Sequence, residues 1–181
     1  MKVSLYIATS LDGFIARENG DLDWLPGSNG EKGNEDLGYQ DFMDSIDVLV
    51  MGRKTYEKVL SFGKWPYGEK HVVVLSSTLT QVPTELAETI EIRSGTPAKI
   101  IKELERSGAK HIYVDGGTTI QKFLRAGLIQ EIIITRVPVL IGSGISLFGN
   151  RDKDPRLCHI NTTSYESGLV QSIYRVVNQP A

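Results

Sequence analysis

The sequence predicts an α/β domain with a mostly parallel central sheet, helices on both faces of that sheet and an antiparallel hairpin at the C-terminal end. Segments of β-strand and helical periodicity alternate as far as residue 140, which is typical of a parallel sheet with crossover helices. The run Glu131–Leu140 is almost continuously apolar, as expected for a strand buried on both faces. Two alternating segments around Ser167-Gly168 then predict the closing hairpin.

In the N-terminal half, three apolar runs predict buried strands at Val3–Ala8, Ile46–Met51 and His71–Leu75. Residues Asp36–Ser45 place their apolar side chains on one face of a helix, and a second helix is expected where the second strand gives way at Gly52. Strand and helix therefore begin to alternate well before the middle of the chain.

The second half continues the alternation. A short strand is expected near Glu88–Arg93, and Thr96-Pro97 is a favourable helix start because proline suits the first helical turn. His111–Val114 predicts another strand, which Asp115-Gly116-Gly117 terminates. Thr118 is then expected to cap a helix whose apolar residues recur at helical spacing.

The composition fits one domain spanning residues 1–181, with 40% apolar and 23% charged residues. A net charge of -2 gives no general attraction for nucleic acid or an anionic membrane. No apolar run approaches the roughly 20 residues that span a bilayer. Cys158 is the single cysteine and no signal-peptide pattern is seen, so a cytoplasmic protein is expected. Cys158 is expected to be a small buried residue, and the three dispersed histidines predict no metal site.

Three strand ends carry residues suited to binding phosphate, and in an open α/β sheet ligands bind beyond the carboxyl ends of the strands. An arginine fork and serine hydroxyls can hold a phosphate, and the amides of a glycine turn before a helix can hold a pyrophosphate. An ordinary strand-to-helix turn is the alternative for the double glycine. The three segments are Gly52-Arg53-Lys54-Thr55, Ser76-Ser77 and Gly116-Gly117-Thr118-Thr119.

Five motifs, in this order along the chain, resemble the dihydrofolate-reductase-like family. The nearest branch is the reductase domain of the bifunctional riboflavin-biosynthesis deaminase-reductase, together with its stand-alone relatives. The resemblance covers roughly residues 2–177 and implies that fold and an NADPH-dependent hydride transfer. The motifs are Ser10-Leu11-Asp12-Gly13, Met51-Gly52-Arg53-Lys54-Thr55-Tyr56, Val74-Leu75-Ser76-Ser77, Asp115-Gly116-Gly117, and Pro138–Gly144 with Leu147-Phe148.

The resemblance also implies roles for single residues. Arg53 and Ser76-Ser77 would lie near the adenosine 2′-phosphate of NADPH, and the Asp12–Trp24 loop resembles a mobile lid over the nicotinamide. The residues implied to bind the cofactor are Ala8, Ile15, Gly52, Arg53, Lys54, Thr55, Ser76, Ser77, Gly116, Gly117, Thr118 and Thr119. The candidate substrate-binding residues are Asp12, Trp24 and Thr135. For Trp24, closure of a loop over the core is the alternative.

Asp36 is the candidate catalytic residue. It falls where folate reductases place a helical carboxylate that assists protonation, and hydride addition to C=N requires a proton on nitrogen. Asp36 is also one of several acids in this region. A helix N-cap or a solvated helix face is therefore the alternative interpretation.

Efficient reduction of dihydrofolate is not expected. Folate reductases grip the substrate carboxylate with an arginine before the third strand, and here that neighbourhood reads Gly68-Glu69-Lys70-His71. Lysine does not replace a bidentate arginine, and Glu69 would repel a carboxylate. A deaminase half is not expected in these residues, because its zinc site would need His and Cys ligands and the sequence has one cysteine. A monofunctional reductase of a ribosylaminopyrimidine phosphate is a further alternative, although no dedicated substrate-phosphate cluster stands outside the cofactor residues.

The leading hypothesis is an NADPH-dependent reductase of C=N or C=O in a small pterin-like or pyrimidine-like substrate. The alternatives are a non-catalytic nucleotide-binding protein on the same fold, a weak dihydrofolate reductase, and a partner-binding domain without a ligand. The long apolar strand and the C-terminal hairpin could supply the subunit face of a homodimer.

Overall fold

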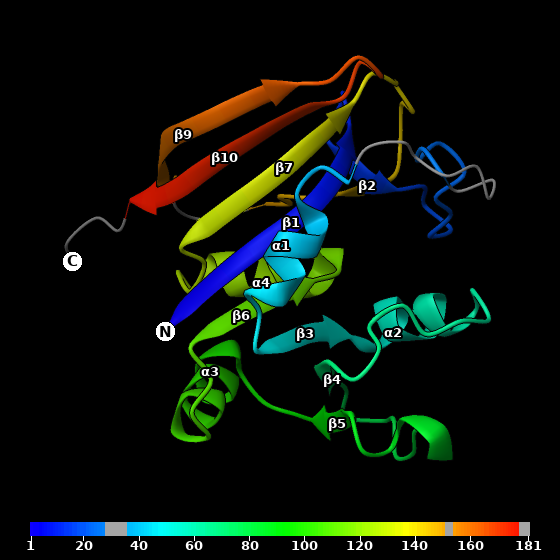
Figure 1. Cartoon of the computed structure of the whole chain (residues 1–181), viewed down its shortest axis with the longest axis vertical. Helices are drawn as coiled ribbons and strands as arrows, with labels where there is room; N and C mark the ends of the chain where they lie inside the picture. Colours follow the sequence, from blue (N-terminus) through cyan, green and yellow to red (C-terminus); the bar gives the residue numbers. More distant parts are fainter. Residues whose placement is uncertain (28–35, 151–153, 178–181) are drawn as a thin grey trace.

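The computed structural model describes residues 1–27, 36–150 and 154–177. Its centre is an eight-stranded sheet (Figure 1). The strands of this sheet are β1 (Lys2–Ser10), β3 (Val48–Gly52), β4 (His71–Leu75), β5 (Ile90–Arg93), β6 (His111–Asp115), β7 (Glu131–Val137), β9 (Arg156–Ser164) and β10 (Val170–Val177).

The strand order is β5-β4-β3-β6-β1-β7-β10-β9. Every pairing from β5 to β7 is parallel, and the two pairings made by β10 are antiparallel. The predicted parallel sheet with a C-terminal hairpin is therefore confirmed. In the described part of the chain, no helix has the length and apolar character needed to cross a membrane.

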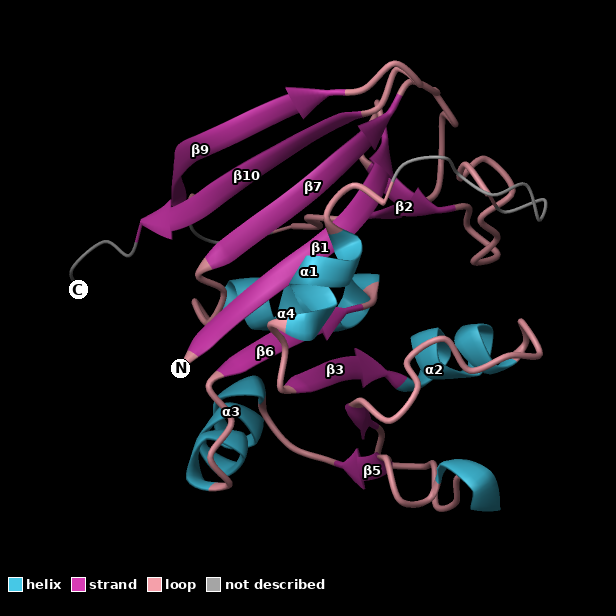
Figure 2. Ribbon diagram, in the orientation of Figure 1, coloured by secondary structure: helices cyan, strands magenta, loops and turns pink. Residues whose placement is uncertain are grey.

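Helices cover both faces of the sheet, and Figure 2 shows α1 and α4 on opposite sides of β1. The helices are α1 (Tyr39–Asp44), α2 (Arg53–Leu60), α3 (Pro97–Arg106) and α4 (Gly117–Arg125), with a short 3₁₀ turn at Thr84–Leu86. On one face, Ile100 of α3 and Phe123 of α4 pack in the same core cluster as Leu5. On the other face, Phe42 of α1 and Tyr56 of α2 belong to a second cluster.

Two predicted helix starts are wrong, and in both cases a glycine is the cause. The first helix starts at Tyr39 rather than Asp36, because Leu37 and Gly38 have φ of 55° and 76°, outside the helical region. The helix after β6 starts at Gly117 with Gly116 as its N-cap, at φ 88°. Thr118 therefore lies inside the first turn and does not cap the helix.

The last strands also differ from expectation. The long strand ends at Val137 instead of continuing to Leu140, since Pro138 cannot donate to a ladder. Cys158 is exposed, so its predicted burial is wrong, because it lies on β9 at the edge of the sheet. A separate two-stranded sheet, β2 (Phe14–Ala16) with β8 (Ile145–Ser146), is too short to be detected from periodicity.

The core makes a direct prediction about stability. Phe123 is 0% exposed, so we expect Phe123→Ala to lower the free energy of unfolding by about 3–5 kcal/mol through lost burial and a cavity. Phe62, which is 57% exposed, is the matched control. Phe62→Ala should change the free energy of unfolding by less than about 0.5 kcal/mol. Urea unfolding followed by circular dichroism measures both, and equal losses would contradict the assigned core.

Candidate functional site

Three strand ends meet at one edge of the sheet. β4, β3 and β6 are neighbours and run parallel, with Gly52 opposite Leu75 and Met51 opposite Asp115. Their carboxyl ends therefore lie side by side, and β3 leads directly into α2 (Figure 2). The structure thus brings together the three segments that the sequence singled out. This edge is where an open α/β sheet binds its ligands.

The turns that follow β3 and β6 pack against each other through glycine. A Cβ on Gly52 would lie 2.7 Å from Thr119 Oγ1, and a Cβ on Gly116 would collide with Thr55 Oγ1. Gly116 also has φ 88°, a conformation that L-residues with side chains rarely adopt. Glycine at both positions lets the beginnings of α2 and α4 lie next to each other.

Neither of these helix starts is capped by a side chain. In contrast, α3 is capped by Thr96, whose hydroxyl accepts a hydrogen bond from Lys99 N at 3.3 Å. The first N–H groups of an α-helix have no partner within the helix, and they carry the positive end of its dipole. Two such ends at one sheet edge form a favourable site for an anion.

Arg53 is held in place on the first turn of α2. Its Nε donates to Glu57 Oε1 at 2.6 Å, and its Nη1 donates to Thr78 Oγ1 at 2.7 Å. Ser76 Oγ accepts from Thr78 N at 3.1 Å and from Leu79 N at 2.9 Å. Ser76 therefore shapes the turn after β4, and Thr78 is the residue of that turn that contacts the guanidinium.

Sequence reasoning missed Glu57 and Thr78. Glu57 could have been found, because a glutamate four residues after an arginine on a helix forms a common ion pair. Thr78 directly follows Ser76-Ser77, and no sequence pattern distinguished it as a contact of Arg53. Lys54 and Ser77 lie exposed on the same two turns, and their cofactor roles stay predictions.

The loop after β1 is anchored rather than free. Ser10 Oγ donates to Asp12 Oδ1 at 2.6 Å, and Gly142 N donates to Asp12 Oδ2 at 2.8 Å. The Ser10 hydroxyl, followed by the Gly142 and Ile141 amides, holds the pKa of Asp12 below its usual range. Asp12 thereby ties this loop to the segment after β7, and its substrate role stays a prediction.

The remainder of the lid-like loop reaches α2 and α4. Lys58 of α2 forms an ion pair with Asp21 at 3.1 Å. A Cβ on Gly117 would lie 2.8 Å from Ile15 Cδ1, so Ile15 packs against the first residue of α4. Trp24 is half-buried, and among the described residues its indole N–H has no hydrogen-bond partner.

A second group of polar residues lies beside β1. Ala8 and Thr135 are register partners on β1 and β7. Thr135 is buried, and its Oγ1 accepts from Gln171 Nε2 at 3.2 Å. Gln171 also donates to the Tyr6 hydroxyl at 3.0 Å. Sequence reasoning missed Gln171, because it interpreted the C-terminal strands only as a hairpin.

Asp36 is exposed, and its carboxylate oxygens accept from Gln40 N at 3.3 and 3.4 Å. This contact to the first turn of α1 resembles helix capping, which was the alternative interpretation. The catalytic role of Asp36 stays a prediction.

Asp115 is the acid that sequence reasoning overlooked. It ends β6, and burial raises the pKa of Asp115 to about 6, although a hydrogen bond from Gly116 N at 2.7 Å partly opposes this shift. Burial raises the pKa of Tyr39 to about 12, and the charge of Asp115 raises it further. The same two causes raise the pKa of Tyr67. The available signal was an aspartate at a strand end directly before a double glycine.

These features fit a dinucleotide better than a metal ion. Two uncapped helix starts, a turn without Cβ atoms and an arginine fork match a pyrophosphate and a further phosphate. Within residues 1–27, 36–150 and 154–177, no group of three or more His, Cys, Asp or Glu side chains could hold a metal ion.

Known proteins share this architecture. A structure from Shewanella sp. PV-4, described as a candidate riboflavin biosynthesis protein, is 41% identical with a TM-score of 0.90, covering 98% of this chain and 100% of that chain. The uncharacterized protein YwjB of Bacillus subtilis is 37% identical over 159 residues, covering 86% of this chain and 87% of that protein.

Dihydrofolate reductase of Enterococcus faecalis, solved in complex with NADP(H), shares the fold at 16% identity with a TM-score of 0.68, covering 98% of this chain and 97% of that chain. The family model of the RibD C-terminal domain matches residues 1–171. The chain therefore belongs to the RibD C-terminal domain family, a family of reductases.

Proposed function

We propose that this protein is an NADPH-dependent reductase that transfers hydride to C=N or C=O in a small pterin-like or pyrimidine-like substrate. The observation that carries the proposal is the meeting of two uncapped helix starts and the Arg53 fork at one sheet edge, beside the half-buried acid Asp115. Family membership supports a reductase, and the site suggests the cofactor.

The cofactor would be held by the first turns of α2 and α4. The amides of Lys54 and Thr55, with those of Thr118 and Thr119, would bind the pyrophosphate, and Arg53 would bind the 2′-phosphate. When bound, NADPH supplies the hydride, while the protein orients the reacting groups and excludes water.

We assign the proton donor to Asp115 rather than Asp36. Asp36 is exposed and contacts the start of α1, whereas the Asp115 carboxyl lies at the end of β6, close to the Tyr39 and Tyr67 phenols. A carboxyl group with a pKa near 6 retains its proton in part of the population near neutral pH. It can therefore deliver that proton to a substrate nitrogen or oxygen as hydride arrives.

The residues expected to contact the substrate favour a small heterocycle over folate. Thr135 and Gln171 provide buried hydrogen-bonding groups next to β1. Lys70, which stands near the position of the substrate-gripping arginine, donates to Ile46 O at 2.7 Å. Both residues precede their strands, so this contact lies at the amino edge of the sheet. Lys70 is therefore not placed to bind a substrate carboxylate at the carboxyl edge of the sheet.

Arg53→Ala tests the cofactor site. We expect the affinity for NADPH to fall at least about tenfold, since a hydrogen bond to a charged group contributes about 1.5–3 kcal/mol, while the affinity for NADH stays nearly constant. Titration calorimetry measures both. Arg106→Ala is the control. It removes the same charge from the exposed face of α3 and should leave the affinities for NADPH and NADH unchanged.

Activity is measured as NADPH oxidation against a panel of pterins and pyrimidines. A protein whose melting temperature rises with NADPH but which oxidises none of it would be a nucleotide-binding protein without catalysis. Loss of affinity in Arg106→Ala as large as in Arg53→Ala would refute the assigned phosphate site.

Glu57→Gln tests the carboxylate beside that site. Glu57 bonds Arg53 Nε at 2.6 Å, so its negative charge competes with a phosphate for the same guanidinium. We expect the variant to bind NADPH roughly three- to tenfold more tightly, about 1 kcal/mol, and NADH as before. Glu103→Gln breaks a comparable i,i+4 pair with Lys99 on α3 and is the matched control. Weaker NADPH binding in Glu57→Gln would show that Glu57 only orients Arg53.

Asp115→Asn tests the acid. The folded-state pKa of about 6 lies above the ordinary value of 3.8, so wild-type stability is highest while Asp115 is protonated and falls as pH rises through 6. We expect the variant to be more stable than wild type by about 3 kcal/mol at pH 8 and by less than about 1 kcal/mol at pH 4. Turnover should fall about a hundredfold. Identical pH dependence of unfolding in both proteins would contradict the assignment.

A further inference from the structure

We propose that Gln171 and Thr135 together select the substrate by its lactam edge, a ring C=O next to a ring N–H. The inference rests on the proposed reductase function and adds which part of the substrate the protein recognises. Gln171 of β10 and Thr135 of β7 are register partners, and Thr135 is also the partner of Ala8 on β1. Both polar side chains are buried, at 8% and 3% exposure.

The two side chains lie on the face of the sheet that α1 covers (Figure 2). Four strand residues pack in or against the cluster that contains Phe42 of α1, namely Tyr113 of β6, Tyr6 of β1, Ile133 of β7 and Ile173 of β10. Side chains two positions apart on a strand share a face. The residues two positions nearer the carboxyl edge of the parallel strands are Asp115, Ala8, Thr135 and Gln171. A ring lying over β1 would therefore have the proposed acid on one side and the Thr135–Gln171 pair on the other.

Two contacts fix the orientation of the Gln171 amide. Its Nε2 lies 3.1 Å from Leu37 O, and a carbonyl oxygen only accepts, so the amide nitrogen must face it. The Tyr6 hydroxyl donates its own hydrogen to Leu37 O at 2.9 Å, and it can therefore only accept from Nε2, at 3.0 Å. If the amide turned over, Oε1 would face two oxygens that have no hydrogen to donate to it.

The backbone of Leu37 makes this orientation rigid. Its φ of 55° lies in the left-handed region, which a residue with a side chain keeps only where the surrounding structure holds it. Here two donors hold the same carbonyl, Tyr6 from β1 and Gln171 from β10. The segment before α1 is thereby attached to the sheet, and the Gln171 amide is held in place before a ligand binds.

The fixed amide leaves one acceptor and one donor without a protein partner. Within the described residues, no group donates to Gln171 Oε1. Thr135 Oγ1 accepts from Gln171 Nε2 at 3.2 Å, and in residues 1–27, 36–150 and 154–177 its own hydroxyl hydrogen has no acceptor. Buried polar groups in proteins are normally paired, so these two groups are available to a ligand.

A lactam edge matches this pair of groups. Its C=O can accept the Thr135 hydrogen and its N–H can donate to Gln171 Oε1, so both buried groups gain a partner. The amino counterpart of the same ring has an NH2 group and a bare ring nitrogen at these positions. That nitrogen and Oε1 would be two acceptors without a hydrogen between them, and the fixed amide cannot turn over to repair the contact. The site therefore selects against the amino ring as well as for the oxo ring.

Matched pairs of rings test the proposal. Pterin and 2,4-diaminopteridine differ only at the lactam edge, and uracil and cytosine give the same comparison on a single ring. Calorimetric titration at pH 7, where all four rings are predominantly uncharged, measures their binding with and without NADP+. We expect wild type to bind the oxo member of at least one pair at least about tenfold more tightly. The pair with the larger preference distinguishes a pterin-like from a pyrimidine-like substrate.

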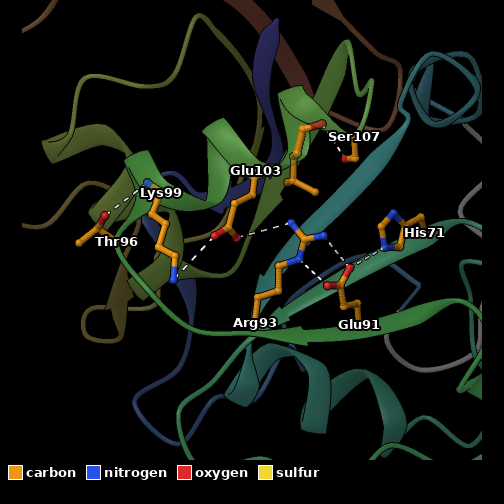
Figure 3. A network of polar contacts seen from close by, with 8 residues as sticks. His71, Glu91, Arg93, Thr96, Lys99, Glu103 and Ser107 are labelled. Atoms are coloured by element: carbon orange, nitrogen blue, oxygen red, sulfur yellow. Dashed lines mark hydrogen bonds and ion pairs between the residues drawn. The ribbon is translucent and has the colours of Figure 1, made fainter.

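Variants of similar shape locate the preference. Gln171→Met and Thr135→Val should each reduce it to less than about threefold, because each removes one of the two recognising groups. Tyr6→Phe removes the other donor to Leu37 O and should keep the preference, which separates recognition from support of the segment before α1. Thr96→Val removes a hydroxyl from the cap of α3 (Figure 3), on the opposite face of the sheet, and should also keep it.

Circular dichroism establishes that the four variants are folded, and NADPH binding measured on the same samples reports on the cofactor site separately. Equal affinity of wild type for both members of each pair, or no binding of any ring, would overturn the proposal. A preference that survives Gln171→Met, or one that Tyr6→Phe reduces as much as Gln171→Met does, would also overturn it. Failure of the proposed function is a different result, since it would be seen as absence of NADPH binding by wild type.

Discussion

The packing of two turns against each other determines the geometry of the candidate site. Thr119 fills the space beside Gly52, and Thr55 fills the space beside Gly116. A methyl group at either glycine would collide with the facing threonine, so that either the threonine or the two turns would have to shift. The proposed anion binding at this edge depends on the separation of the starts of α2 and α4, because the field at a helix start declines within one turn.

The same edge contains charges of both signs, and these charged groups differ in how far they are exposed to water. Arg53 and Glu57 are exposed, where water weakens their mutual attraction. Asp115 is half-buried near two phenols, and its pKa rises because partial removal from water penalises the ionised carboxyl. The proposed phosphate-binding region and the proposed proton donor can therefore coexist at neighbouring strand ends.

The two outer strands of the sheet give the molecule an asymmetric surface. β5 is short and its charged side chains are paired, whereas β9 is long, uncharged over eight residues and exposed along its length. Parallel strands need crossover connections, which cover the middle of the sheet with helices. The C-terminal hairpin has no crossover helix, and this explains why β9 lies uncovered.

Periodicity and glycine placement in the sequence determined the fold class, the parallel sheet, the closing hairpin and the three strand ends that meet at the site, because these depend on local pattern and on general rules of topology. The tertiary structure alone decided the partners of Arg53, the anchoring of Asp12 and the raised pKa of Asp115. It also decided that Gly116, rather than Thr118, starts α4 and that Cys158 is exposed. The physical reason is that a side chain's neighbours and its distance from water come from segments remote in sequence, and a local pattern contains no information about them.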